Sequence, residues 1–176
     1  GEEVDRINNL VDQLLQLRAT EKPCLATEDP AEIITQVCQL VAGFGAKTGV
    51  RVRLEATTGP QTVWCDRNQI KQVLINVILN AMEASSEEGE VIIQSGTVDK
   101  KFEIYVSDSG TGMDAQTLRA AFEPFFTTKE NGSGLGLFVA RNIIEGKGGK
   151  IYIKSNPGKG TTVVISLKTS EENKHG

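Results

Sequence analysis

The sequence predicts an α+β domain: a two-layer α/β sandwich in which helices cover one face of a mixed, mostly antiparallel sheet. Segments with apolar residues at helical spacing are interspersed with segments that alternate in the manner of strands. Successive predicted strands follow one another across turn residues, as in hairpins, instead of alternating with helices as in βαβ units. A doubly wound parallel sheet is therefore not expected.

Composition favours one folded domain whose partner is a small ligand or a protein. The 176 residues are 39% hydrophobic and carry a formal net charge of −4, which allows a core and shows no basic excess for nucleic acid. Cys24, Cys38 and Cys65 are widely spaced and include no Cys-x-x-Cys pair, which argues against a zinc site or a disulfide framework. No apolar run approaches the ~20 residues that span a bilayer. We expect a cytoplasmic location without membrane contact from this chain, whether or not a longer protein is membrane-anchored.

The first predicted helix, residues 2–18, carries an apolar seam formed by Val4, Ile7, Leu10, Val11, Leu14 and Leu17. A lone helix cannot bury such a seam, so we expect it to pair with another helix, from upstream in a longer chain or from a second copy. Folding back onto the domain is the alternative.

A second helix is predicted over residues 29–46, because Asp29 supplies an N-cap and Pro30 suits the first helical position. Two short strands follow, at residues 50–55 and 62–65, on either side of a Gly-Pro turn.

A third helix, residues 66–86, is predicted to lie in the core, with Asp66 as its cap. Its apolar face consists of Ile70, Val73, Leu74, Val77, Ile78 and Ala81. Steps of three and four residues return to one side of a helix, so a narrow polar stripe also forms, from Gln69, Gln72, Asn76, Asn80 and Glu83. A polar stripe on so apolar a helix requires an explanation.

The remaining elements complete the sheet. Residues 90–97 and 101–107 are predicted to form a hairpin with alternate residues of the second strand pointing inward. Strands are predicted at residues 150–155 and 161–168, after a helix over residues 134–146 whose apolar face contains Leu135, Phe138, Val139 and Ile143. The only histidine, His175, lies in a polar tail, so histidine-based catalysis within the chain is not expected.

Glycine-rich stretches and two asparagines predict a nucleotide pocket. Asp108 ends an apolar strand just before Gly110 and Gly112, where glycine would let a ligand approach the backbone. Its carboxylate could accept a hydrogen bond from an exocyclic amine such as that of adenine, or form an ordinary Asp turn. Asn80, one turn after Asn76, offers an amide oxygen suited to Mg²⁺ shared with nucleotide phosphates, although buried Asn also bridges backbone groups.

Residues 132–136 lead into a helix, whose first N–H groups form a natural phosphate site. The preceding residues 122–129 hold three aromatics and suit a mobile lid. Lys129 could reach a phosphate or simply solvate the surface. The spacing fits neither a dinucleotide fingerprint nor a phosphate P-loop.

Taken in order, these motifs resemble the successive boxes of the sensor histidine kinase ATP-binding domain of the GHKL superfamily. The resemblance covers residues 29–168. The Glu-Pro-Phe-Phe-Thr-Thr-Lys form is similar to kinases of nitrogen-regulation and sporulation type. The matching boxes are Asn76-x-x-x-Asn80-Ala81, Asp108-x-Gly110-x-Gly112, Phe122 to Lys129, Gly132-x-Gly134-x-Gly136-Leu137 and Gly160-Thr161-Thr162.

The resemblance implies a Bergerat fold that binds ATP and Mg²⁺, with Asn80 on the metal and Asp108 on the adenine amine. Asn76 and Lys129 would assist transfer of the γ-phosphoryl group to a histidine. Nucleotide contacts carry over to the other box residues, which are Glu83, Gly110, Gly112, Met113, Phe126, Thr127, Thr128, Gly132, Ser133, Gly134, Leu135, Gly136, Leu137, Thr161 and Thr162.

It also implies a domain organisation. Residues 1–20 would be the second helix of the dimerisation and phosphotransfer hairpin, residues 29–168 the catalytic domain and residues 169–176 a tail. A full-length kinase would form a homodimer through the N-terminal helix and act on a response regulator. Without the histidine-bearing helix, this chain is not expected to phosphorylate itself. Many family members have a basic residue in place of Glu83, which weighs against a phosphate contact there.

Three other functions stay open. GHKL ATPases of the chaperone or topoisomerase type have a Glu base four residues before the metal Asn, whereas this chain has Asn76, an amide that cannot take a proton. A nucleotide-sensing interaction module, or a serine kinase of the anti-sigma type, would bind ATP without phosphorylating histidine.

Overall fold

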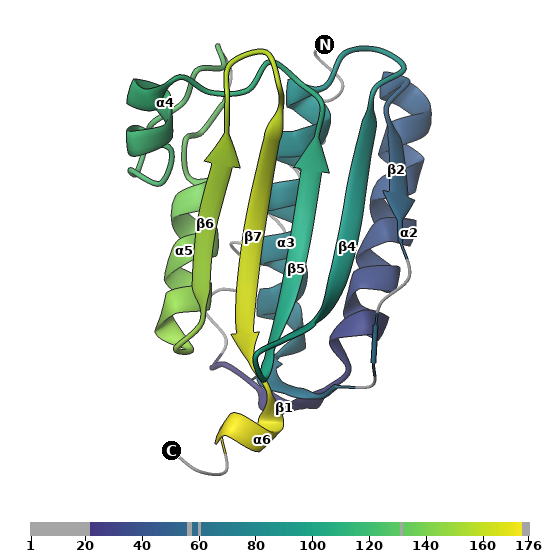
Figure 1. The fold of residues 1–176 in the computed structure, drawn as a ribbon, viewed down its shortest axis with the longest axis vertical. Helices are drawn as coiled ribbons and strands as arrows, with labels where there is room; N and C mark the ends of the chain where they lie inside the picture. Colours follow the sequence, from purple (N-terminus) through teal and green to yellow (C-terminus); the bar gives the residue numbers. More distant parts are fainter. Residues whose placement is uncertain (1–21, 56–57, 60, 131, 174–176) are drawn as a thin grey trace.

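A computed structural model describes residues 22–55, 58–59, 61–130 and 132–173. One layer of helices covers one face of a five-stranded sheet in the order β2-β4-β5-β7-β6 (Figure 1). A small second sheet, β1-β3, lies at the lower end. The elements are β1 (Leu25–Glu28), α2 (Pro30–Thr48), β2 (Arg51–Leu54), β3 (Val63–Asp66), α3 (Arg67–Ala84), β4 (Glu90–Val98), β5 (Lys101–Asp108), α4 (Ala115–Ala120), α5 (Gly136–Gly146), β6 (Lys150–Ser155), β7 (Thr161–Lys168) and α6 (Ser170–Asn173).

The predicted two-layer, mostly antiparallel architecture is confirmed. The β4–β5 hairpin forms, and β7 pairs antiparallel with both β5 and β6. The hairpin interpretation is wrong for the first strands, however. β2 pairs parallel with β4, while β3 leaves the main sheet to pair with β1, a strand that we did not predict. The chain between β2 and β4 contains α3, and parallel neighbours require such a long crossover.

Helix caps form where the sequence predicts them. Asp29 Oδ1 accepts a hydrogen bond from Ala31 N at 2.9 Å, and Pro30 is the first residue of α2. Asp66 is buried and caps α3, with Oδ1 accepting from the N–H groups of the second and third helical residues at 2.8 and 3.1 Å. Its Oδ2 accepts from Cys24 N at 2.7 Å, so one carboxylate joins the β1 end of the chain to α3.

The predicted apolar face of α3 is buried throughout. The predicted face of α5 is mostly wrong. Ala140 and Ile144 are the buried residues of this helix, and Leu137 and Ile143 pack beside them. Four consecutive apolar residues at 137–140 allow two choices of helical face, and contact with α3 and the sheet selects between them.

The two ends of the chain differ in what the structure describes. The predicted helix at residues 2–18 and His175 lie outside the described residues. At the C-terminal end Thr169 is buried and bridges Val63, and Ser170 N donates to Thr62 O at 2.8 Å. The described fold thus extends past residue 168.

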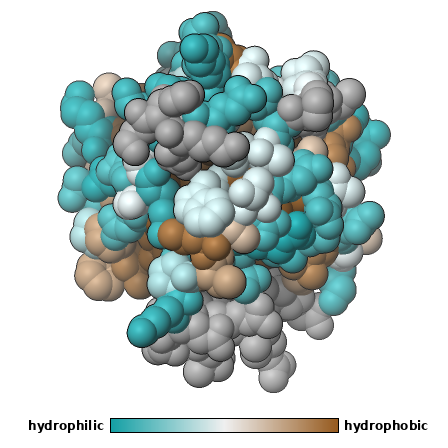
Figure 2. All heavy atoms as spheres, turned by 90° about the horizontal axis from the view of Figure 1, so that it is seen from below, coloured by the Kyte–Doolittle hydropathy of each residue, from teal (hydrophilic) through white to brown (hydrophobic). Residues whose placement is uncertain are grey.

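The lower end of the molecule mixes apolar and polar side chains (Figure 2). Trp64 of β3 and Leu25 of β1 are both partly exposed there. The three cysteines are unpaired. None of the helices in the described ranges has both the length and the apolar content needed to cross a bilayer.

The cap of α3 provides a test of this fold. We expect Asp66→Ala to lower the free energy of unfolding by about 2 kcal/mol, at the upper end of the range for N-caps, because a buried carboxylate with three donors is lost. Asp29→Ala is the matched control and should cost about 1 kcal/mol, since that exposed cap accepts one bond. Urea unfolding measures both, and equal losses would contradict the joining role of Asp66.

Candidate nucleotide-binding site

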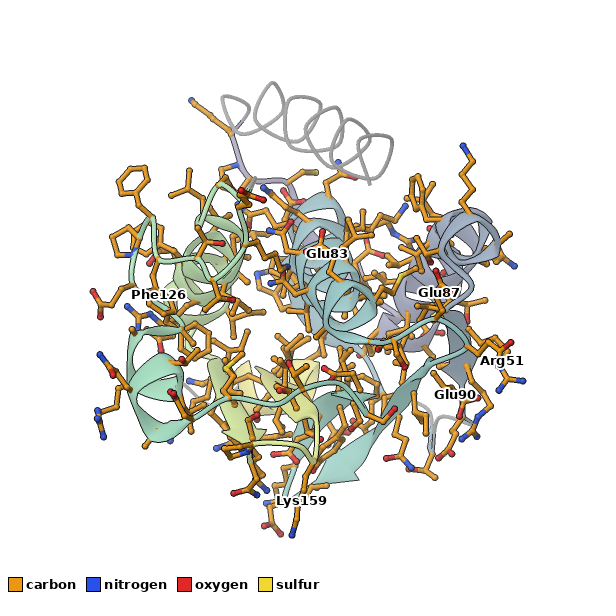
Figure 3. The ribbon with its side chains drawn as sticks, turned by 90° about the horizontal axis from the view of Figure 1, so that it is seen from above. Arg51, Glu83, Glu87, Glu90, Phe126 and Lys159 are labelled. Atoms are coloured by element: carbon orange, nitrogen blue, oxygen red, sulfur yellow. The ribbon has the colours of Figure 1, made fainter. Side chains whose placement is uncertain are left out.

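The predicted site residues gather at the end of the molecule opposite β1 and β3. Figure 3 looks onto this end, with Glu83 on α3 and Phe126 on the segment that precedes α5. Three parts of the chain meet here: the C-terminal half of α3, the end of β5 with its following loop, and residues 122–130 with 132–137.

Asp108 ends β5 and is half-buried. Its Oδ1 accepts a hydrogen bond from Gly110 N at 2.9 Å, so the Asp turn considered above is present. Burial raises the pKa of the Asp108 carboxyl above its ordinary value, and the backbone N–H groups of Gly110 and Thr161 offset part of this increase. A hydrogen bond from one further donor would therefore stabilise the ionised form of the Asp108 carboxylate.

The glycines after Asp108 have a structural reason that we did not predict. Gly112 has φ +69°, and a Cβ there would lie 1.9 Å from Asn156 O. A Cβ on Gly110 would lie 2.2 Å from Ala84 O. Close approach of the protein's own backbone therefore requires glycine here, before any ligand is considered.

Ser155, the last residue of β6, contacts this loop and was missed. Its Oγ accepts from Met113 N at 2.8 Å and donates to Gly160 O at 3.0 Å, which ties the loop after β5 to the β6–β7 turn. Its only signal in the sequence is its position at the end of a strand, before Asn-Pro-Gly.

The two threonines of β7 differ in position. Thr161 pairs with Asp108 across the strands, whereas the Thr162 hydroxyl bonds the Ser107 hydroxyl at 2.9 Å. Because successive residues of a strand point to opposite faces, the Thr162 side chain lies on the face away from Asp108. Only Thr161 is brought to the site by its side chain.

The two asparagines of α3 both contact the segment around the start of α5. The Asn76 side chain is buried, and its Nδ2 donates to Gly136 O at 3.2 Å. Asn80 Oδ1 accepts from Lys129 Nζ at 3.2 Å, and Lys129 also forms an ion pair with Glu83. The polar stripe predicted on α3 therefore faces the predicted lid.

The predicted lid is folded against the domain at both ends. Phe122 packs on the core beneath the Arg141 guanidinium, and Gly134, with φ +69°, contacts the backbone of Phe125. Phe125 itself has φ +64° and is 74% exposed. Positive φ is rare for an aromatic residue and indicates a locally strained segment. Of the three aromatics, Phe125 alone is exposed.

The start of α5 is suited to an anion. The helix is 11 residues long, and no side chain caps its first turn, so its first N–H groups face the site without a side-chain partner. Ser133 Oγ accepts from Leu135 N at 3.3 Å just before it. Thr127 Oγ1 accepts from Lys129 N at 3.0 Å and shapes the preceding turn. Thr128 and Gly132 are exposed.

A hollow of about 300 Å³ between α3 and α5 lies at the other end of these helices. It is lined by Gln69, Val139, Asn142, Ile143, Gly146 and Lys147, and none of these is a predicted site residue.

Comparisons with known proteins point to one family. Residues 65–171 match the family described as histidine kinase-, DNA gyrase B-, and HSP90-like ATPase. The sensor histidine kinase ZraS of Klebsiella oxytoca is 36% identical over 173 residues, which cover 98% of this chain and 37% of that protein. Sporulation kinase D of Bacillus subtilis is 36% identical, with 96% and 34% coverage. The chain thus spans about a third of the length of these relatives.

Solved structures give the same result. The nucleotide-free catalytic domain of histidine kinase ThkA superposes with a TM-score of 0.75 at 35% identity, covering 82% of this chain and 95% of that one. ThkA in complex with the response regulator protein TrrA gives 0.76 at 31% identity, covering 97% and 49%. The chain therefore belongs to the histidine kinase-, DNA gyrase B- and HSP90-like ATPase family, and it contains the catalytic, ATP-binding domain of a sensor histidine kinase.

Proposed function

We propose that the domain binds ATP with Mg²⁺ between α3, the end of β5 and the start of α5. In the whole protein it would transfer the γ-phosphoryl group to a histidine on another segment. The observation that carries this proposal is the contact of Asn76 with Gly136 and of Asn80 with Lys129, because these contacts bring an amide oxygen close to a helix start.

The donor set fits the metal. Asn80 Oδ1 already accepts a hydrogen bond from the Lys129 ammonium group, so this position tolerates a neighbouring positive charge. Within the described ranges, no group of three or more His, Cys, Asp or Glu side chains is arranged to hold a metal ion. The ion would therefore need phosphate oxygens beside Asn80, which is the usual setting of Mg²⁺ in nucleotide sites.

The chain's own residues would act by positioning. Bound Mg²⁺ supplies charge neutralisation at the phosphates. The first N–H groups of α5 would orient the phosphates, and Asp108 would accept from the adenine amine. Asn76, held by Gly136 O, cannot remove a proton from water. This favours transfer to an acceptor over hydrolysis, with proximity as the main source of rate.

The partners follow from the relatives and the sequence. ThkA has been solved with its response regulator, and we infer a response regulator as the downstream partner here. The apolar seam predicted at residues 2–18 supports a homodimer formed through that helix. A nucleotide-sensing module that transfers nothing is the second candidate function.

Nucleotide binding tests the pocket. At a ligand concentration about 100 times Kd, Mg²⁺ with a non-hydrolysable ATP analogue should stabilise the fold by about 2.7 kcal/mol. Asp108→Asn and Asn80→Ala should each weaken binding about tenfold or more, since each removes a hydrogen bond or a metal ligand. Asp114→Asn is the matched control, because Asp114 caps the exposed start of α4. Thermal unfolding measures the shifts, and equal shifts in all variants would reject the assigned contacts.

The protonation of Asp108 makes adenine recognition depend on pH. Binding of an amine donor favours the ionised carboxylate, so the bound pKa lies below the raised pKa of the free domain. The preference for ATP over purine riboside triphosphate, which lacks the amine, should be complete above the free pKa and decline as pH falls through it. Titration calorimetry with both nucleotides, from neutral pH down to the lowest pH at which the domain stays folded, measures this ratio. A constant ratio would remove Asp108 from adenine recognition.

Transfer of the γ-phosphoryl group can be tested by adding a histidine acceptor. With a histidine-bearing helical segment added in trans, labelled ATP should produce acid-labile phosphohistidine. Asn80→Ala should slow this by about 100-fold, as for loss of one transition-state contact, while Asn142→Ala on the exposed side of α5 should not. Label on serine would indicate an anti-sigma type of kinase, free phosphate an ATPase, and binding without transfer a sensor.

A further inference from the structure

Lys129 contacts α3 through its side chain. Its ammonium group donates to Asn80 Oδ1 at 3.2 Å and pairs with the Glu83 carboxylate. Asn80 and Glu83 lie three residues apart on one side of the helix, so a single lysine reaches both. These contacts join positions 46 and 49 residues apart in sequence.

Asn80 Oδ1 is also the oxygen that the proposed function assigns to Mg²⁺. An ammonium group and a divalent cation repel one another strongly at contact distance, so they exclude each other at one amide oxygen. We propose that Lys129 takes the metal's place at Asn80 in the nucleotide-free state, that Glu83 is the positioning residue that holds it there, and that Mg²⁺ with ATP binds by exchange with Lys129. The role of Asn80 in this inference rests on the proposed function.

The local structure allows such an exchange. Thr127 Oγ1 fixes the backbone N–H of Lys129, whereas the lysine side chain is a flexible stem with a mobile point charge. The charged head can therefore move while its backbone stays in place. Exposed ion pairs contribute little to stability, so release from Glu83 costs little, and an incoming phosphate offers the same cation a stronger partner.

This exchange also explains an acidic residue at position 83. The negative charge of the Glu83 carboxylate would itself repel a phosphate. In this chain the cation is Lys129, which lies across the site from Glu83. Glu83 holds the Lys129 side chain in an ion pair until nucleotide binds. Glu83 then acts through Lys129 and is not expected to touch the substrate.

Lysine acetylation by an N-hydroxysuccinimide ester, followed by peptide mass mapping, reports on the Lys129 amine directly. Lys159 is exposed and serves as the internal reference (Figure 3). Without nucleotide, Lys129 should react more slowly than Lys159, and Glu83→Gln should speed its reaction about two- to fivefold. Glu87→Gln, the same change in the exposed turn after α3, is the matched control and should have no effect.

The second part of the experiment repeats the acetylation at saturating concentrations of Mg²⁺ and the ATP analogue. Because Glu83 no longer holds Lys129 after exchange, the Lys129 reactivities of the wild type and Glu83→Gln should become equal. Glu83→Gln should lower the Mg²⁺ concentration for half-maximal analogue binding by about two- to fivefold, since Lys129 is then held less firmly at Asn80, and it should have no such effect in the Lys129→Gln background.

Three results would overturn the inference. Equal reactivity of Lys129 in the wild type and Glu83→Gln without nucleotide would remove the role of Glu83. A difference that persists at saturation would remove the exchange. If the analogue binds in an Asp108-dependent manner and either result is found, the proposed function stands and this inference alone fails. If no analogue binds, the proposed function and the exchange fail together.

Discussion

Burial of one face of α3 against the sheet is the interaction on which the site depends. Val73, Leu74, Val77 and Ile78 have no exposed surface, and each such side chain contributes about 2 kcal/mol by leaving water. With that face fixed, the helix cannot turn about its axis. The polar stripe must then face the segment before α5, because residues three and four apart share one side of a helix.

Polar contacts hold the parts of the site that the proposed exchange would alter. Asn76 bonds the start of α5, and Asn80 and Glu83 hold Lys129. Hydrogen bonds and exposed ion pairs can be exchanged for bonds to a ligand at little net cost, whereas loss of apolar packing cannot be compensated in this way. The domain thus separates a rigid apolar frame from a replaceable polar contact surface, which nucleotide entry requires.

The glycines after Asp108 can be required both for packing of the protein's own backbone and for approach of a ligand. Gly110 and Gly112 approach backbone carbonyls of α3 and of the β6–β7 turn so closely that no side chain fits. These contacts shape the loop that presents Asp108, so the requirement for glycine comes first from the fold. A nucleotide then meets a backbone that the protein has already brought into position.

The features that could be predicted from the sequence alone are the N-cap and apolar face of α3, the N-cap of α2, the β4–β5 hairpin and the polar stripe with Asn76 and Asn80. These features depend on spacing within one segment and on residue chemistry, which are local properties. Relations between distant segments were not predictable in this way: the β1–β3 pair, the face of α5, the link through Ser155, and the ion pair of Glu83 with Lys129. Several partners satisfy a short strand, an ambiguous apolar run or a charged side chain equally well, so only the packing of the complete chain decides which one each of them meets.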